Sequence, residues 1–176
     1  MKNILLFMVM VFGASLYKCA ALADQQADQR DNAVRQLKSV VWPDITPDAL
    51  FEICKQDVVN ADLGEGKTPL YMAVMWGNRR AAEELLNLGA AVNQAAIYNV
   101  TPLMKAVLEG YEDMVSFLVG RGASVSLADA RGRTAIDIAR ELHLSKIEDI
   151  LQKAMEDVGP EWKGGSVSPK SLLIKG

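Results

Sequence analysis

Three copies of one segment decide the fold of this chain: TPLYMA at residues 68–73, TPLMKA at residues 101–106 and TAIDIA at residues 134–139. Each copy begins with a threonine that stands 33 residues after the previous one. The same step carries Leu85 onto Leu118 and Leu151, and Gly77 onto Gly110. A fixed period in this range predicts stacked repeats, each of which completes its core only against its neighbours.

Each copy has the composition of two short helices joined by a turn. The Thr-Pro start favours helix initiation, because the threonine hydroxyl accepts backbone N–H groups and the proline ring presets φ. Gly77 and Gly110 fall where the first helix must end, a position that favours left-handed backbone geometry. We predict second helices over residues 79–88, 112–121 and 145–154. We expect their core side chains to be Leu85, Leu86, Leu118, Val119, Ile147, Ile150 and Leu151.

The segment before the first full copy carries a weaker version of the same pattern. Helical spacing predicts a helix over residues 28–41 with an apolar face of Ala33, Val34, Leu37, Val40 and Val41. A second helix is predicted from Pro47 to Lys55, with Thr46 as its N-cap. Val59-Asn60 stands one step before Val92-Asn93. We therefore interpret residues 24–61 as a degenerate leading repeat that caps the stack.

The whole pattern resembles the ankyrin repeat, whose units read Thr-Pro-Leu-His, then an Ala, a Gly, a Leu-Leu pair and Gly-Ala-Asp-Val-Asn. The resemblance extends over residues 57–154 and implies an all-α solenoid of helix-turn-helix units with short β-turn tips. It divides this part of the chain into units 62–94, 95–127 and 128–154. Residues 155–176 are rich in Gly, Pro and Ser, and we predict a flexible tail, with docking of Trp162 and residues 172–174 on the stack as the alternative.

The sequence departs from the family pattern at three kinds of position. The usual histidine is replaced by Tyr71, Met104 and Asp137, so the hydrogen bonds that it makes between units are lost or replaced. His143 stands where the third unit should have a glycine, as expected of a closing unit. Asn99 occupies the turn glycine of the second unit, which asparagine tolerates because it enters left-handed geometry readily.

Residues 1–23 have the features of a cleaved signal peptide. Lys2 gives a positive start, residues 4–17 are uncharged and mostly apolar, and Ala21-Leu22-Ala23 suits a signal peptidase. The apolar run is shorter than the ~20 residues that span a bilayer, so a permanent anchor is the weaker alternative. A lipoprotein at Cys19 is a second alternative, although Lys18 is unlike the small residue that such signals carry. We expect an exported bacterial protein, periplasmic or secreted, with no membrane association after cleavage.

Charge and cysteine content narrow the functional classes. The formal net charge is −3, and it becomes −5 without Lys2 and Lys18 of the signal segment. This acidic balance argues against nucleic acid or an anionic membrane as the partner. Cys54 is the only cysteine left after cleavage, and its apolar neighbours predict a small buried hydrophobic residue rather than a nucleophile.

The family resemblance implies a non-catalytic module that binds another protein through the turn tips and the concave side of the first helices. Carried over by position, the partner-binding residues predicted here are Met75, Trp76, Ile97, Tyr98, Val100, Leu108, Glu109, Arg131, Arg133 and Leu142. This set is more apolar than a solvated surface, and exposed apolar area with Trp and Tyr is typical of interaction sites. The alternative is that Trp76 and Tyr98 pack on each other or under the C-terminal tail.

An enzyme is the competing class, and the sequence offers little for catalysis. His143 is the only histidine, and its position favours a surface or capping role over a general base. Neither a Gly-rich phosphate loop nor a metal-ligand spacing is evident, so we predict no enzyme, no metal and no cofactor. Asp137 with Arg140 and Glu141 indicates a salt-bridged surface. The unidentified protein partner belongs either to the same cell envelope or, for a secreted effector, to a foreign cell.

Overall fold

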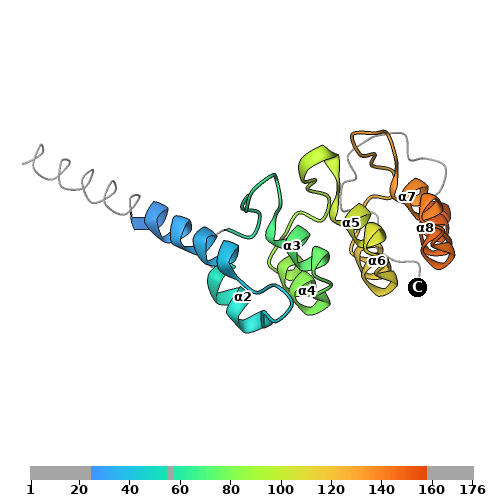
Figure 1. Ribbon diagram of the computed structural model, residues 1–176. Coiled ribbons are helices and arrows are strands. Elements are labelled where there is room, and N and C mark those ends of the chain that lie inside the picture. Colours follow the sequence, from blue (N-terminus) through green and yellow to red (C-terminus); the bar gives the residue numbers. More distant parts are fainter. Residues whose placement is uncertain (1–24, 55–57, 158–176) are drawn as a thin grey trace, which may run out of the picture.

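The computed structural model describes residues 25–54 and 58–157, and every named element within them is a helix. Paired helices follow one another in a row, and the loops before the first helices of the three full units project to one side (Figure 1). The predicted all-α solenoid is confirmed. The predicted signal peptide, residues 1–23, lies outside the described residues, as does the tail from residue 158 onward.

The described chain contains four helix pairs. The leading pair is formed by residues 25–39 and α2 (Pro47–Cys54). In the three full units the pairs are α3 (Pro69–Met75) with α4 (Arg79–Asn87), α5 (Pro102–Leu108) with α6 (Glu112–Gly120), and α7 (Ala135–Glu141) with α8 (Ser145–Asp157). The first helices α3, α5 and α7 pack side by side, which sets the direction of the stack.

The repeated threonines begin the first helices as the sequence predicts. Thr68, Thr101 and Thr134 have extended backbone, and each hydroxyl accepts the backbone N–H three residues later, at 3.2, 3.2 and 3.4 Å. Pro69 and Pro102 follow at the first helical position, where a missing N–H has no helical partner to lose. The same local chemistry therefore starts each unit at the same point.

The first helices end at left-handed residues, also as predicted. Gly77 and Gly110 have φ of +66° and +72°, and His143 has φ of +56° at the corresponding position. A Cβ atom on Gly77 would lie 3.2 Å from the Tyr111 ring, so the ring would have to shift slightly, and the left-handed φ itself favours glycine. Histidine is among the residues enriched in left-handed geometry, which explains why the closing unit accepts it.

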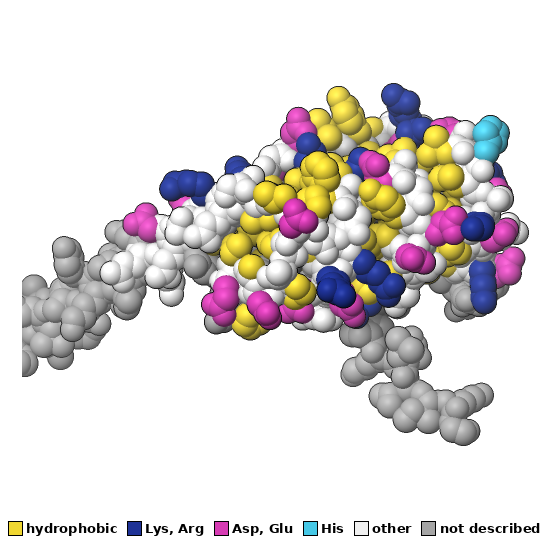
Figure 2. Space-filling view, turned by 60° about the horizontal axis from the view of Figure 1, so that its bottom comes forward, with side chains coloured by type: hydrophobic (Ala, Val, Ile, Leu, Met, Phe, Trp, Pro, Cys, Tyr) yellow, Lys and Arg dark blue, Asp and Glu magenta, His cyan; other side chains and the backbone are white. Residues whose placement is uncertain are grey.

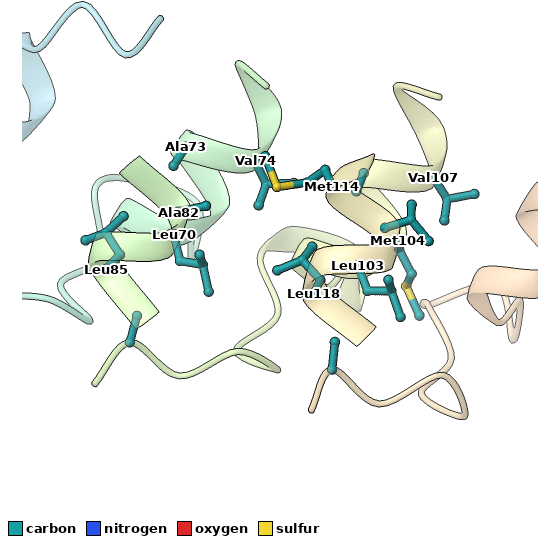
Figure 3. Packing of buried hydrophobic residues seen from close by; sticks show 14 of the residues in the cluster. Leu70, Ala73, Val74, Ala82, Leu85, Leu103, Met104, Val107, Met114 and Leu118 are labelled. Atoms are coloured by element: carbon teal, nitrogen blue, oxygen red, sulfur yellow. The ribbon is translucent and has the colours of Figure 1, made fainter. Parts of the chain in front are cut away.

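The core is continuous from the leading pair to the last helix. Figure 3 shows its centre, where Met114 extends from α6 towards Val74 of α3. Ala73, Ala106 and Ala139 are fully buried, and their small side chains let neighbouring first helices approach closely. The predicted core is confirmed: Leu85, Leu118, Ile147 and Leu151 are buried, while Leu86, Val119 and Ile150 are partly buried against them.

Repeated asparagines tie the leading pair to the first full unit and the first full unit to the second. The Asn60 side chain accepts the Ala91 N–H at 2.8 Å, and the Asn93 side chain accepts the Ser124 N–H at the same distance. The leading pair is thus joined to the first full unit by the same bond that joins the first to the second. On the outer side, Phe117 of α6 lies near the guanidinium groups of Arg79 and Arg121, at 5.0 and 5.5 Å.

Two sequence predictions about the ends are wrong. Val41 was predicted on the apolar face, yet it is 65% exposed because the leading helix ends at residue 39. The flexible tail was predicted from residue 155, but α8 continues to Asp157. Lysine, alanine, methionine and glutamate favour helix, so they extend α8 without a core to pack against, and Met155 is 47% exposed.

Candidate functional site

The projecting loops before the first helices are tied together by their backbones. We call residues 62–67 tip 1, residues 95–100 tip 2 and residues 128–133 tip 3. The Ile97 N–H of tip 2 donates to the Glu65 carbonyl of tip 1 at 2.9 Å. One step later, the Ala130 N–H of tip 3 donates to the Tyr98 carbonyl at 2.8 Å. The tips therefore form one ordered row rather than three independent loops.

Tips 1 and 3 are each folded around a carboxylate. Asp62 accepts the N–H groups of Gly64 and Gly66, at 2.7 and 3.0 Å. Asp129 accepts those of Arg131 and Arg133, at 2.8 and 2.9 Å. The backbone hydrogen bond from Arg133, together with the bond from its side chain, lowers the pKa of Asp129. These two tips are closed, polar turns.

Tip 2 differs because alanines 95 and 96 stand where its neighbours have the carboxylate. Its turn contains Tyr98 and Asn99, with φ of +59° and +57°. The left-handed Asn99 was predicted, whereas the left-handed Tyr98 was not. Left-handed geometry costs a residue with a Cβ about 1–2 kcal/mol, and tip 3 avoids this at the corresponding Arg131. Tip 2 therefore holds a bulky side chain in strained geometry.

The side chains of tip 2 project from the protein. Tyr98 is 71% exposed and Ile97 is 43% exposed. Strained backbone at an exposed aromatic residue is common at binding sites, where the surroundings impose the conformation. Here the surroundings are the bonds to both neighbouring tips, which fix the position of the Tyr98 backbone.

A second group of exposed apolar residues lies at the ends of the first helices. Trp76 and Leu142 are the C-caps of α3 and α7, and Leu108 is the last residue of α5. All three are at least 40% exposed. Because α3, α5 and α7 pack side by side, their ends form a row along the stack. Apolar side chains gather between charged ones on the face shown in Figure 2.

The remaining predicted site residues have different environments. Glu109 is exposed and pairs with Lys105. Arg131 is exposed at the tip, whereas Met75 and Val100 are partly buried, with Val100 packed against the core. Arg133 is held by Asp129 at 2.8 Å and by Glu141 at 2.6 Å, so its side chain stabilises tip 3. Val100 and Arg133 are consequently less available to a partner than the sequence suggests.

The groups considered for catalysis are dispersed. His143 is exposed, and burial raises the pKa of the Cys54 thiol to about 11. Asp137 bonds to Thr134 within the helix cap, and Arg140 pairs with Glu148, so the predicted salt-bridged surface exists with other partners.

Residues 25–54 and 58–157 contain no group of three His, Cys, Asp or Glu placed to hold a metal ion. The helices in these ranges are all too short or too polar to cross a membrane.

A family model described as ankyrin repeats in three copies matches residues 29–129, which is more than half of the chain. The chain belongs to the ankyrin-repeat family. The family resemblance drawn from the Thr-Pro segments is thereby confirmed. Ankyrin repeats are protein–protein interaction modules, generally without enzyme activity.

Several ankyrin-repeat proteins match part of this chain. The chain is 33% identical over 95 residues to ankyrin repeat and SAM domain-containing protein 6 of Rattus norvegicus, covering 52% of this chain and 11% of that protein. It is 38% identical over 96 residues to human cyclin-dependent kinase inhibitor 2A, covering 54% and 61%. It is 40% identical over 81 residues to human B-cell lymphoma 3 protein, covering 44% and 18%. The chain thus spans less than two thirds of each relative.

Proposed function

We propose that this ankyrin-repeat chain is a non-catalytic module that holds one protein partner outside the cytoplasm. Trp76, Ile97 and Tyr98 form the centre of the proposed contact, with Leu108 and Leu142 extending it along the stack. The observation that carries the proposal is Tyr98, a 71% exposed aromatic residue in a left-handed turn. A stack selected only for stability and solubility would place a polar residue or glycine there.

The chemistry of these residues suits protein recognition. Large aromatic side chains bury ~150–250 Å² each, so two of them supply a substantial part of a small interface. In protein interfaces, Trp and Tyr often contribute much of the binding energy. The residues around them contribute little energy themselves but keep water away from them. The backbone bonds that fix tip 2 reduce the entropy that binding would otherwise remove.

Export is part of the proposal and rests on residues 1–23. A positive start, a short apolar run and small residues before position 24 support cleavage by a signal peptidase. Intact-mass measurement of the protein from producing cells should give a chain that begins at Asp24. A mass that retains residues 1–23 would remove the extracytoplasmic part of the proposal and leave the binding part intact.

The binding part is tested by a double variant, Trp76→Ala with Tyr98→Ala. The tagged wild-type chain is used to isolate its partner from cells that produce it, and the purified partner is then titrated with each variant. We expect affinity to fall by at least about a hundredfold, since each lost aromatic anchor costs about 2 kcal/mol. The circular dichroism spectrum should be unchanged, because both side chains are exposed.

Val41→Ala with Leu127→Ala is the matched control. These two side chains are also exposed apolar residues, at 65% and 39%, but they belong neither to tip 2 nor to the ends of the first helices. The control should bind like the wild type. Equal affinity of the double variant Trp76→Ala/Tyr98→Ala and the wild type would refute the proposed surface.

A further inference from the structure

The leading repeat lacks a tip. The 33-residue step places that tip at residues 29–34, one period before tip 1. These residues are instead part of the continuous helix over residues 25–39. Among the described residues, tip 1 is therefore the first tip of the row, and the leading repeat contributes none.

The backbone at this end of the row is closed by a side chain. In tips 2 and 3, the N–H groups of Ile97 and Ala130 donate to the tip before them. The corresponding N–H in tip 1 belongs to Gly64, and it donates to Asp62 at 2.7 Å. The Gly64 N–H is thus bonded to a side chain and does not make the bond to a neighbouring tip that Ile97 and Ala130 make.

A hollow of about 430 Å³ lies where the leading helix, tip 1 and α3 meet. Its apolar lining comes from three parts of the chain: Leu37, Trp42, Leu63, Met72 and Met75. Tips 2 and 3, which pack beside the tip before them, are six-residue loops, so an occupant of similar length beside tip 1 is a short peptide segment.

The charged lining of the hollow is predominantly positive. Lys38 and Lys67 line it together with one carboxylate, that of Glu65. Lys67 bonds to Glu65 at 2.6 Å, whereas Lys38 has no ion pair within the described ranges. A net positive lining in a chain of net charge −3 favours an occupant with a carboxylate.

Trp42 also lies at this hollow. Its side chain lines the hollow and is only 3% exposed. Its indole Nε1–H is buried and has no acceptor among residues 25–54 and 58–157. An unpaired buried donor costs about 1–3 kcal/mol, and such groups are rare in folded proteins.

We propose that this hollow binds an extended peptide segment in which an aliphatic or aromatic side chain stands next to a carboxylate. The apolar side chain packs against Trp42 and Met72, and the carboxylate pairs with Lys38. The inference rests on the proposed function, because the segment belongs to the protein partner. It adds a second contact at the leading end of the stack, separate from Trp76 and Tyr98.

The test uses selection of twelve-residue peptides displayed on phage against the folded chain. Enriched peptides should carry Asp or Glu beside Leu, Ile, Phe or Trp. Synthetic peptides with these sequences should bind Lys38→Glu about five- to tenfold more weakly than the wild type, because an exposed attraction becomes a repulsion. Lys153→Glu, an exposed charge reversal on α8, is the matched control and should bind like the wild type.

Peptide affinity for the double variant Trp76→Ala/Tyr98→Ala distinguishes binding in the hollow from binding at the proposed contact of Trp76 and Tyr98. Peptides seated in the hollow should retain their affinity for the double variant Trp76→Ala/Tyr98→Ala. The inference is overturned if no peptide is enriched, if the enriched peptides lack acidic residues, or if Lys38→Glu binds them as tightly as Lys153→Glu. Peptides that lose affinity only for the double variant would support the proposed function and refute peptide binding in the hollow.

Discussion

Corresponding residues of the three tips differ in backbone conformation, and the difference shows which of them the fold alone explains. Arg131 and Tyr98 occupy corresponding positions in tips 3 and 2, and only Tyr98 is left-handed. Tip 3 obtains its turn from Gly132 and from the carboxylate of Asp129. Tip 2 has neither, and it keeps an exposed tyrosine in unfavourable geometry. Glu65, at the corresponding position of tip 1, is also left-handed with φ of +58°, so tips 1 and 2 share the strained turn and tip 3 lacks it.

Replacing Tyr98 by asparagine should stabilise the protein and weaken binding. Asparagine adopts left-handed geometry more readily than tyrosine, and the exposed ring contributes little to the core, so we expect a gain of about 0.5–1 kcal/mol. Urea denaturation measures the change. Arg131→Asn is the control, and it should bring no comparable gain because Arg131 is not left-handed. A loss of stability in Tyr98→Asn would show that the tyrosine serves the fold.

Asp129 should make stability depend on acid pH. Its pKa is lowered in the folded protein by the backbone N–H of Arg133 first, and by further bonds to that residue and Arg131. Its contribution is therefore complete above the ordinary aspartate pKa of ~3.9 and is lost as the pH falls through the lower folded value.

Urea midpoints between pH 7 and pH 2 test this dependence. Asp129→Asn should be less stable than the wild type near neutrality, and the two proteins should converge at the acid end. Asp149→Asn, an exposed change on α8, should follow the wild type throughout. A gap between Asp129→Asn and wild type that stays constant with pH would contradict the assignment.

At the scale of elements, the helix ends decide how the units are spaced. Each first helix begins at a threonine cap and ends at a left-handed residue, so its length is fixed by local chemistry. The second helices are less uniform, since α8 continues to Asp157 where α4 and α6 end at Asn87 and Gly120. The regular spacing of the units is therefore set more by the first helices than by the second helices.

Gly77→Ala should destabilise the protein more than Gly110→Ala. Both positions are left-handed, so each alanine costs about 1–2 kcal/mol in backbone strain. Only at Gly77 would the new Cβ approach the Tyr111 ring, at 3.2 Å, which adds about 1 kcal/mol. Thermal or urea denaturation of the two variants measures the difference. Equal losses would show that the Tyr111 ring moves aside without cost.

At the scale of the whole molecule, stability is shared between units and interfaces. In a stacked repeat protein it approximates a sum of unit terms and nearest-neighbour terms. The middle unit has a neighbour on each side, through contacts of α5 with both α3 and α7. Damage to its core should therefore affect the entire stack.

Leu118→Ala in the middle unit should lower the free energy of unfolding by about 2–5 kcal/mol, the range for deleting a fully buried leucine. Leu118 has no exposed surface, whereas Leu86 is only partly buried. Leu86→Ala is the matched control, and it should cost clearly less. A Leu118→Ala variant as stable as Leu86→Ala would mean that the middle core is not tightly packed.

The sequence by itself determined the architecture. The 33-residue step, the threonine caps and the glycine ends act within a few residues, so the helices and their order could be predicted without tertiary information. The leucines at fixed positions predicted the core for the same reason. The repeated Val-Asn pair also contains the two asparagines that bond to the next unit, although the sequence did not predict those bonds.

Only the tertiary structure decided which surfaces are available. The exposure of Trp76 and Tyr98 and the use of Arg133 within tip 3 depend on residues brought together from different units. The bonds of tip 2 to both neighbouring tips join residues from different units of the chain. The hollow at Trp42 is lined by residues of the leading repeat, tip 1 and α3, which are distant from one another in the sequence. Local sequence fixes local backbone, whereas exposure and strain result from packing between segments distant in the chain.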